Sequence, residues 1–581
     1  MSVPRLLRRV VFAVSATLVA GSFVGGGSPP IASASFSYQR ISGEGSSWAA
    51  NAIDAMRVNV RQFGITVDYN PSGSTAGRRN FLNGTVDFAA SDIPFQFSPE
   101  DGSAPENPAP GSYAYIPVTA GGTSFMYNLQ INGKRVTNLR LSGENVAKIF
   151  TGVITTWNDP AIAADNPGLT MPARTIVPVV RSDGSGSSAQ FTKWMIAEHG
   201  ALWTEFCNRS GRAPACGNTS FYPTIPGMIA QNGDLGVAGY VSQGFAEGAI
   251  GYVNYSYALN AQFPVAKVLN EAGYYTEPTP DNVAVSLLQA RINTNEADPT
   301  VYLTQQLEGV YNDTDPRSYQ LSSYSYLIVP TKVAGQFNED KGATVGAFAY
   351  YALCQAQQQW ASVGYSPMPI NLVEASFDQI RKIPGVVVQD IDIASCDNPT
   401  FSANGTNVLA QNAPQPQACD QQGSVSQCPN GTGGLSNVPT DVLAGPVTGG
   451  TTPAGGTTPA GGSTPAGGST PAAGSTPAGG SVPGAATGTT LPGSNGGVDA
   501  GTGGQGCDAD TGLCAGGSSG TPTGGGTATG GAAGAIATTV LPQPSGWGGS
   551  TVLLLLVIAL TLGLVLTPAL AWRRFSSKEP A

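Results

Sequence analysis

The chain has 581 residues, too many for one compact domain, and glycine and proline are both more frequent after about residue 410 than before it. Charged residues make up only 11% of the chain and the formal net charge is −10, which argues against a nucleic-acid-binding surface. An acidic protein that binds an anion must do so with local dipoles and a few selected cations. We therefore expect a globular part in the first two thirds of the chain, with no nucleic-acid partner.

The N-terminus has the pattern of a secretory signal. Arginines within the first nine residues precede an apolar run at 10–20, and small residues at 32–34 offer a cleavage site. The apolar run is too short to span a bilayer comfortably. We therefore predict a signal peptide over residues 1–34 and export of the rest.

The chain has eight cysteines, all of them in the exported part. An even number of cysteines in an exported protein suggests disulfides, although adjacency in sequence does not fix their connectivity. We expect consecutive pairs: Cys207 with Cys216, Cys354 with Cys396, Cys419 with Cys428, and Cys507 with Cys514. A metal site is not expected, because no Cys-x-x-Cys occurs and His199 is the only histidine.

Short β-rich runs alternate with helical segments between residue 35 and about residue 398, which is typical of α/β domains. Several of the expected strands end in loops of small, hydroxyl-bearing residues, at 43–48, 72–77, 91–92 and 182–188. Ligands of open α/β sheets bind beyond the carboxyl ends of the strands. We therefore expect these loops to converge on one small anion.

The stretch 179–194 is the most informative part of the chain. It passes from an apolar strand end through a Gly/Ser loop into an amphipathic helix. Ser185, Gly186 and Ser187 fall where the helix should begin, so free N–H groups, hydroxyls and the helix dipole favour an anion there. Arg181 adds a planar charged fork that suits an oxyanion. The alternative interpretation is a Gly/Ser turn that only caps a helix.

Together these motifs resemble the PstS family, the extracytoplasmic phosphate-binding proteins of bacterial high-affinity ABC phosphate importers. The resemblance covers roughly residues 35–397. It rests on the motifs Gly43-x-Gly45-x-Ser47, Ser72-Gly73-Ser74, Val86-Asp87-Phe88-Ala89-Ala90-Ser91-Asp92 and Arg181-Ser182-Asp183-Gly184-Ser185-Gly186-Ser187.

The resemblance implies a type II periplasmic-binding-protein fold, in which two α/β lobes are joined by two crossing strands and hold the ligand between them. Lobe I would contain residues 35–120 and 323–400, and lobe II residues 121–322. The hinge crossovers would lie near 119–121 and 321–327. Such lobes close around a ligand by hinge motion. A monomer is expected.

By the same resemblance, the phosphate would be bound by Ser47, Trp48, Ser74, Asp92, Arg181, Ser185, Gly186 and Ser187. Asp183 would orient Arg181 through a salt link. Trp48 stands where the family often has phenylalanine, but its expected contact is made by the main-chain N–H. Ser187 stands where threonine is frequent and keeps the hydroxyl.

Asp92 is the residue expected to set specificity. An ionised carboxylate only accepts hydrogen bonds. Phosphate still carries a proton near neutral pH, whereas sulfate has none to give. Asp92 facing sulfate would leave two like charges without a bridging proton, so truncation of Asp92 should relax discrimination. The alternative interpretation of Asp92 is a solvated turn residue or a helix cap.

No catalytic residue and no cofactor are predicted. A Ser-His-Asp triad would have to rest on His199 alone. The Gly-Ser-Gly-Ser run is not a nucleophile elbow, and no P-loop lysine follows it.

Residues 401–549 are predicted to form a disordered linker, because the Pro/Ala/Gly repeat that starts at Thr451 cannot bury a core. Residues 550–572 are uncharged and long enough for a transmembrane helix. Basic residues in the tail 573–581 place the C-terminus in the cytoplasm. The competing interpretation is a sortase-type wall signal at 541–546, which only approximates that pattern.

The sequence therefore predicts a receptor, tethered to the cell membrane, that captures inorganic phosphate outside the membrane and delivers it to an ABC permease. One alternative is a tethered binding module for another oxyanion or for phosphorylated wall material, without transport. Another is a surface hydrolase that shares the fold.

Overall fold

The computed structural model describes residues 37–212, 216–298, 300–391, 396, 398–400 and 406–441. The predicted signal peptide, transmembrane helix, cytoplasmic tail and Cys507–Cys514 pair lie outside these ranges, as does most of the predicted linker. Within the described ranges, no helix is long and apolar enough to cross a membrane.

One sheet of eight strands forms the centre of the protein, in the order β2-β1-β3-β15-β4-β10-β8-β9. Its strands are β1 (Ile41–Gly45), β2 (Val67–Asn70), β3 (Phe88–Ser91), β4 (Tyr113–Tyr127), β8 (Val177–Arg181), β9 (Ile229–Gln231), β10 (Ala249–Asn254) and β15 (Ser322–Pro330). β1 pairs in parallel with β2 and β3, and β8 pairs in parallel with β9 and β10. Of these strands, β3, β8 and β10 are almost wholly buried and largely apolar, as expected for parallel strands covered on both faces. The edge strands β2 and β9 are partly exposed.

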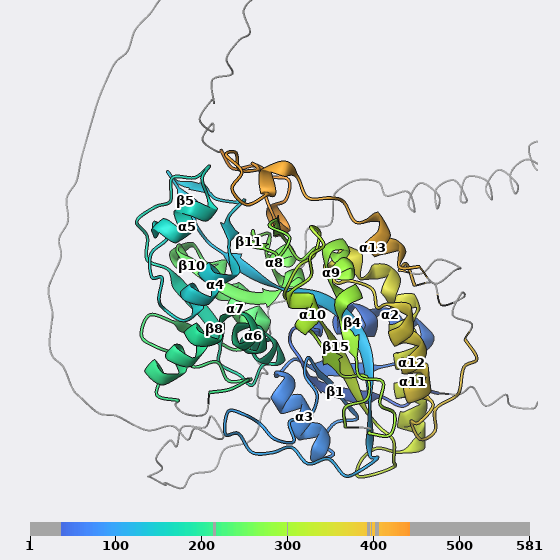
Figure 1. Ribbon diagram of the computed structural model, residues 1–581. Helices are drawn as coiled ribbons and strands as arrows, with labels where there is room; N and C mark the ends of the chain where they lie inside the picture. The colour runs from blue at the N-terminus through green and yellow to red at the C-terminus, as the bar shows by residue number, and fades with distance from the viewer. Residues whose placement is uncertain are drawn as a thin grey trace, which may run out of the picture. The chain divides into compact units, whose positions relative to one another are not determined.

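Strand β4 belongs to both halves of the sheet. It has 15 residues, all buried. Its first part pairs with β15, and its last part pairs with β10. Figure 1 shows β4 running from the half that contains β1 and α3 toward the half that contains β8 and α6. We call the β1–β3 half lobe I and the β8–β10 half lobe II. The predicted two-lobed α/β fold is confirmed, while the exact lobe boundaries stay a prediction.

Helices pack on the strands in both lobes. Those before β4 or after β15 are α2 (Ala50–Asn59), η1 (Val60–Phe63), α3 (Ser74–Leu82), α11 (Glu339–Leu353), η4 (Gln355–Gln359), η5 (Ala361–Val363) and α12 (Ile370–Ile380). Those between β4 and β15 are α4 (Gly143–Phe150), α5 (Pro160–Asp165), α6 (Gly186–Arg209), α7 (Gly233–Val241), η2 (Gly244–Ala246), α8 (Tyr255–Ala261), α9 (Pro280–Ser286), η3 (Leu287–Gln289) and α10 (Glu308–Tyr311). Short strands at the periphery are β5 (Gln130–Ile131), β6 (Lys134–Arg135), β7 (Arg140–Leu141), β11 (Lys267–Leu269), β12 (Tyr275–Thr276), β13 (Arg291–Ile292) and β14 (Gln305–Gln306).

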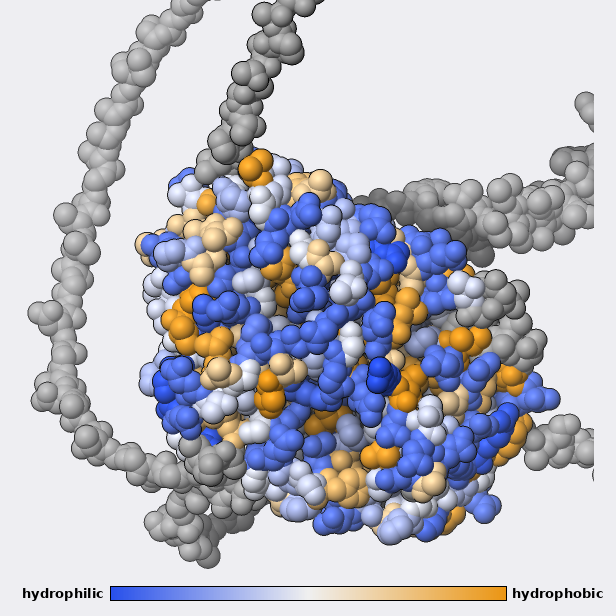
Figure 2. All heavy atoms as spheres, viewed as in Figure 1, coloured by the Kyte–Doolittle hydropathy of each residue, from blue (hydrophilic) through white to orange (hydrophobic). Residues whose placement is uncertain are grey.

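A large core supports both lobes. Trp48 and Trp360 of lobe I and Trp157 and Trp194 of lobe II are among the largest fully buried side chains. The outer face drawn in Figure 2 is mainly hydrophilic, with hydrophobic residues scattered over it. A surface of this composition suits a domain surrounded by water.

The predicted start of the linker at residue 401 is wrong for residues 406–441, which fold back on the globular part. This segment contains α13 (Val408–Asn412), η7 (Ala418–Asp420) and η8 (Gly433–Leu435). Lys267 Nζ donates to Asp420 Oδ2 at 2.6 Å, and Thr432 Oγ1 donates to the carbonyl of Val265 at 2.5 Å. Polar and main-chain hydrogen bonds hold much of the segment in place, so its sequence lacks the apolar periodicity that marks a folded element.

Three of the predicted cysteine pairs are disulfides in the structure: Cys207–Cys216, Cys354–Cys396 and Cys419–Cys428. Cys207–Cys216 and Cys419–Cys428 each join residues 9 positions apart and close short loops, whereas Cys354 and Cys396 are 42 positions apart.

Loss of the Cys354–Cys396 disulfide should destabilise the protein more than loss of Cys419–Cys428. The two bridges span 42 and 9 residues respectively. The chain-entropy relation assigns them about 4 and about 2.6 kcal/mol, because a longer closed loop restricts the unfolded chain more. Equilibrium denaturation of the two double-alanine variants measures this order. A larger loss for the shorter bridge would contradict it.

Candidate anion-binding site

Loops from both lobes meet beyond the carboxyl ends of β1, β2, β3 and β8. In lobe I, the N–H of Gly73 after β2 donates to the carbonyl of Gly45 at the end of β1, at 2.8 Å. Between the lobes, the N–H of Thr75 donates to the carbonyl of Gly184 at 2.9 Å. The loops that the sequence singles out are therefore neighbours in space.

Gly186, the first residue of α6, shows how closely the lobes approach each other. A Cβ atom at this position would lie 2.7 Å from Asp92 Oδ2 and 2.8 Å from Asp92 Cβ, and it would also overlap Ser74 Oγ. No side chain larger than hydrogen fits here without a shift of one lobe against the other. The start of α6 in lobe II thus lies directly against the lobe I loops.

Buried main-chain donors gather at this junction. In the described part of the chain, no acceptor is found for the N–H groups of Ser47, Trp48, Ser74, Gly186 and Ser187. All five residues are buried. A buried donor without an acceptor costs about 1–3 kcal/mol. An anion with several acceptor oxygens satisfies such donors, above all at helix N-termini.

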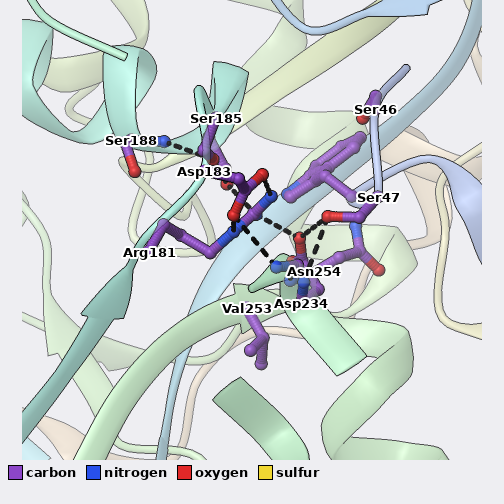
Figure 3. Close-up of polar contacts among 12 residues, drawn as sticks. Ser46, Ser47, Arg181, Asp183, Ser185, Ser188, Asp234, Val253 and Asn254 are labelled. Atoms are coloured by element: carbon purple, nitrogen blue, oxygen red, sulfur yellow. Dashed lines mark hydrogen bonds and ion pairs between the residues drawn. The ribbon is translucent and has the colours of Figure 1, made fainter. Parts of the chain in front are cut away.

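Arg181 supplies the positive charge of the site (Figure 3). Its side chain is 2% exposed, and its Nε and Nη2 donate to the two carboxylate oxygens of Asp183 at 2.8 and 2.5 Å. Its Nη1 donates to Asp234 Oδ2 at 2.5 Å and to Ser187 Oγ at 3.2 Å. Burial alone would lower the pKa of Arg181, but the charges of Asp234 and Asp183 outweigh it and raise the pKa. Arg181 is therefore a permanent cation whose charge two carboxylates already more than balance.

Asp234 is a site residue that the sequence reasoning missed. It lies at the start of α7 with 0% exposure. Its Oδ2 accepts a hydrogen bond from Ser47 Oγ of lobe I at 2.6 Å, and its Oδ1 accepts one from the N–H of Asn254 at 2.8 Å. Its own N–H donates to Ser47 Oγ at 3.0 Å. Asp234 therefore joins the two lobes as well as contacting Arg181. In the structure Gly233, with a φ of +67°, makes the turn from β9 into α7 that places Asp234 here.

Asp92 is 3% exposed, which rules out the solvated turn residue considered as an alternative. Its Oδ1 accepts hydrogen bonds from Ser46 Oγ at 2.6 Å and Ser325 Oγ at 2.5 Å. Its Oδ2 accepts a longer one, of 3.2 Å, from Ser74 Oγ. Burial raises the pKa of Asp92, and the hydrogen bonds from Ser325 and Ser46 oppose that rise. Ser46 and Ser325 are further residues that the sequence reasoning did not select.

Every residue predicted to bind the ligand is buried at this junction. Ser185 caps α6, because its Oγ accepts a hydrogen bond from the N–H of Ser188 at 3.1 Å. The indole of Trp48 is used in packing, with Nε1 donating to Thr123 Oγ1 at 3.1 Å, so only its main-chain N–H is available. The Glu44 carboxylate accepts hydrogen bonds from the side-chain amides of Asn70 and Asn80.

Comparison with known proteins places the chain in a family. Residues 30–356, more than half of the chain, match the PBP superfamily domain. Phosphate-binding protein PstS 2 of Mycobacterium tuberculosis is 31% identical over 318 residues, which cover 53% of this chain and 76% of that protein. Phosphate-binding protein PstS of Xylella fastidiosa is 30% identical over 338 residues, with 58% and 83% covered. The crystal structure of a phosphate-binding protein from Stenotrophomonas maltophilia aligns with a TM-score of 0.41 and 20% identity, covering 64% of this chain and 99% of that one. The chain belongs to the PBP superfamily and, within it, to the PstS-type phosphate-binding proteins.

Proposed function

We propose that the protein is an extracytoplasmic receptor that captures inorganic phosphate between its lobes and delivers it to an ABC importer. The observation that carries this proposal is the set of buried N–H groups without acceptors beside Arg181 and Asp92. Its relatives are named phosphate-binding proteins, which supports phosphate as the anion. Because those names describe binding, we propose no catalytic role.

The site suits phosphate because it stabilises the anion mainly with dipoles. A buried dianion is costly unless its oxygens are satisfied. The two carboxylates of Asp183 and Asp234 more than balance the single charge of Arg181, so the site has no surplus positive charge. The free N–H groups then supply most of the stabilisation, helped by the N-terminus of α6.

Because these donors come from both lobes, a bound phosphate favours the closed arrangement of the lobes over an open one. The proposed ligand contacts are Ser47, Trp48, Ser74, Asp92, Arg181, Ser185, Gly186 and Ser187, with Asp183 and Asp234 orienting Arg181.

Sulfate binding should strengthen as the pH falls, and phosphate binding should persist throughout. The pKa of Asp92 is raised by burial, so its carboxyl gains a proton at a higher pH than an ordinary aspartate. Below that raised pKa, Asp92 can donate a hydrogen bond to sulfate, while above it the carboxylate repels sulfate. Phosphate brings its own proton and needs none from Asp92.

Calorimetric titration of the full-length chain with each anion, from about pH 8 to about pH 5, tests this dependence. Asp92→Asn is the control, since its amide cannot titrate. A sulfate affinity that stays constant or falls with decreasing pH in the unchanged protein would contradict the role given to Asp92.

We further propose that residues 550–572 anchor the protein in the cell membrane, with the C-terminus in the cytoplasm. The support is the uncharged apolar sequence of this segment and the basic residues that follow it. A flexible linker before it would have a reach on the order of 60 Å, enough for the lobes to capture phosphate and still dock on a permease. Alkaline extraction of membranes tests the anchor, because an anchored chain stays in the membrane fraction. A chain released by this treatment would refute it.

Delivery to an importer is tested by phosphate uptake in cells with and without the chain. We expect uptake from dilute phosphate to fall when the chain is deleted and to return when it is restored. Uptake that does not change on deletion would refute delivery and favour the alternative of a tethered binding module without transport.

A further inference from the structure

We propose that Glu100 and Asp101 of lobe I form a latch with residues 217–219 of lobe II, and that this latch slows the release of bound phosphate. We call these contacts the rim latch. The inference rests on the proposed function, since it concerns the closed state of the same site.

The rim latch consists of hydrogen bonds between the lobes, outside the ligand site. The N–H of Asn218 donates to Glu100 Oε2 at 2.8 Å, and the hydroxyl of Thr219 donates to Asp101 Oδ2 at 2.6 Å. A Cβ atom at Gly217 would overlap the side chain of Glu100, so the two segments are also in van der Waals contact. Hydrogen bonds to a carboxylate are stronger than those between neutral groups.

On the lobe II side, the latch segment is fixed to α6. The disulfide Cys207–Cys216 ties the residue before Gly217 to the end of this helix. Trp203 Nε1, also on α6, donates to the carbonyl of Gly217 at 3.1 Å. The segment therefore cannot move independently of the second part of α6, which follows a kink at His199.

The same segment is also bonded to the anion-binding end of α6. The N–H of Thr219 donates to Thr192 Oγ1 at 3.1 Å. The N–H of Ser185, the capping residue of α6, donates to the carbonyl of Ser220 at 2.9 Å. Thr219 thus bonds to lobe I through its hydroxyl and to the ligand-binding helix through its main chain.

On the lobe I side, the latch carboxylates are fixed to α3. Arg78 on α3 pairs with Glu106 at 2.7 Å, with both side chains buried. The carboxylate of Glu106 also accepts the N–H of Gln96, which holds the loop that carries Asp101. Asp101 itself accepts the N–H of Ser103 at 3.0 Å, which orients its carboxylate. Since α3 begins at Ser74 of the site, the latch and the ligand contacts move together on this side too.

Beside the latch, residues of both lobes line a small, partly open pocket of about 20 Å³, which is room for about one water molecule. Its lining includes Thr75 and Arg78 from lobe I and Ser220 and Phe221 from lobe II. The latch therefore bridges the two lobes at a place where little room is left between them. When phosphate binds to the open lobes, the latch has not yet formed. Its release from the closed lobes requires the hydrogen bonds of the latch to break. The latch should thus change the rate of release and not the rate of association.

The test compares two double variants of the full-length chain in rapid-mixing measurements of phosphate binding and release. We expect E100A/D101A to release phosphate about tenfold faster than the unchanged protein, with the same association rate, because it loses both hydrogen-bond acceptors. The matched control is E100Q/D101N, which removes the charges but keeps a carbonyl oxygen at each position. It should restore slow release.

Should E100A/D101A prove too unstable to study, Thr219→Val removes one of the two bonds and should accelerate release by a smaller factor. Unchanged release in folded variants would overturn the rim latch while leaving phosphate binding intact. An unchanged protein that binds no phosphate would instead refute the proposed function, and with it the latch.

Discussion

Replacing Gly186 with alanine should weaken phosphate binding by at least about 100-fold, as a misplacement of about 1 Å at a closely packed site does. The new Cβ atom would lie 2.7 Å from Asp92 Oδ2 and would overlap Ser74 Oγ. The start of α6 would therefore have to move away from lobe I. Its N–H groups and those of lobe I could then no longer reach the same anion. Calorimetric titration with phosphate measures this loss.

Gly200→Ala is the matched control for this variant. Gly200 lies in the second part of α6, just after a kink at His199, and a Cβ atom there would meet nothing within 4 Å. We expect its phosphate affinity to equal that of the unchanged protein. If Gly186→Ala bound phosphate equally well, the close approach of the lobes would not be the binding geometry.

Replacing Arg181 with methionine should reduce both the stability of the protein and its affinity for phosphate. The change leaves Asp183 and Asp234 buried, charged and unpaired, with side-chain exposures of 6% and 0%. Removing one partner of a buried ion pair costs about 3–5 kcal/mol of folding free energy, because the other charge stays buried without a partner. The unpaired carboxylates would also repel the anion, so we expect about a thousandfold loss of affinity.

Chemical denaturation and calorimetric titration measure the two effects. Arg57→Met is the control, because the Arg57–Asp54 pair lies on the surface and is worth at most about 1 kcal/mol. The double variant R181M/D234N should recover part of the lost stability, since it removes one unpaired charge. Full stability of R181M alone would show that the buried carboxylates do not depend on Arg181.

The lobe II half of the site could be predicted because its chemistry is local in sequence. Arg181, Asp183 and the start of α6 follow one another in a single stretch, and the physics of a helix N-terminus acts over the same few residues. The structure places this stretch at the end of β8, as the apolar run before it indicates.

Asp234 and the rim latch could not be predicted in this way, because their partners are distant in sequence. Asp234 lies 53 residues from Arg181 and 187 from Ser47. The Thr219–Asp101 bond joins residues 118 apart. From the sequence alone, Asn-Gly-Asp at 232–234 cannot be distinguished from an ordinary turn.

Residues 406–441 show that prediction of the fold from the sequence is limited in the same way, by contacts between distant residues. Their Gly, Pro and Gln content is that of a linker, yet hydrogen bonds to lobe II order them. The composition of a segment indicates how much apolar surface it can bury. It does not indicate whether the main chain of the segment forms hydrogen bonds with other elements.

We propose that Asp92 selects phosphate by accepting a hydrogen bond from its proton inside a buried site. The most direct measurement is calorimetric titration of the full-length chain and of Asp92→Asn with phosphate and with sulfate near neutral pH. We expect the unchanged protein to bind phosphate and not sulfate, and Asp92→Asn to gain sulfate binding because its amide donates a hydrogen bond. Sulfate binding to the unchanged protein, or continued rejection of sulfate by the variant, would contradict it.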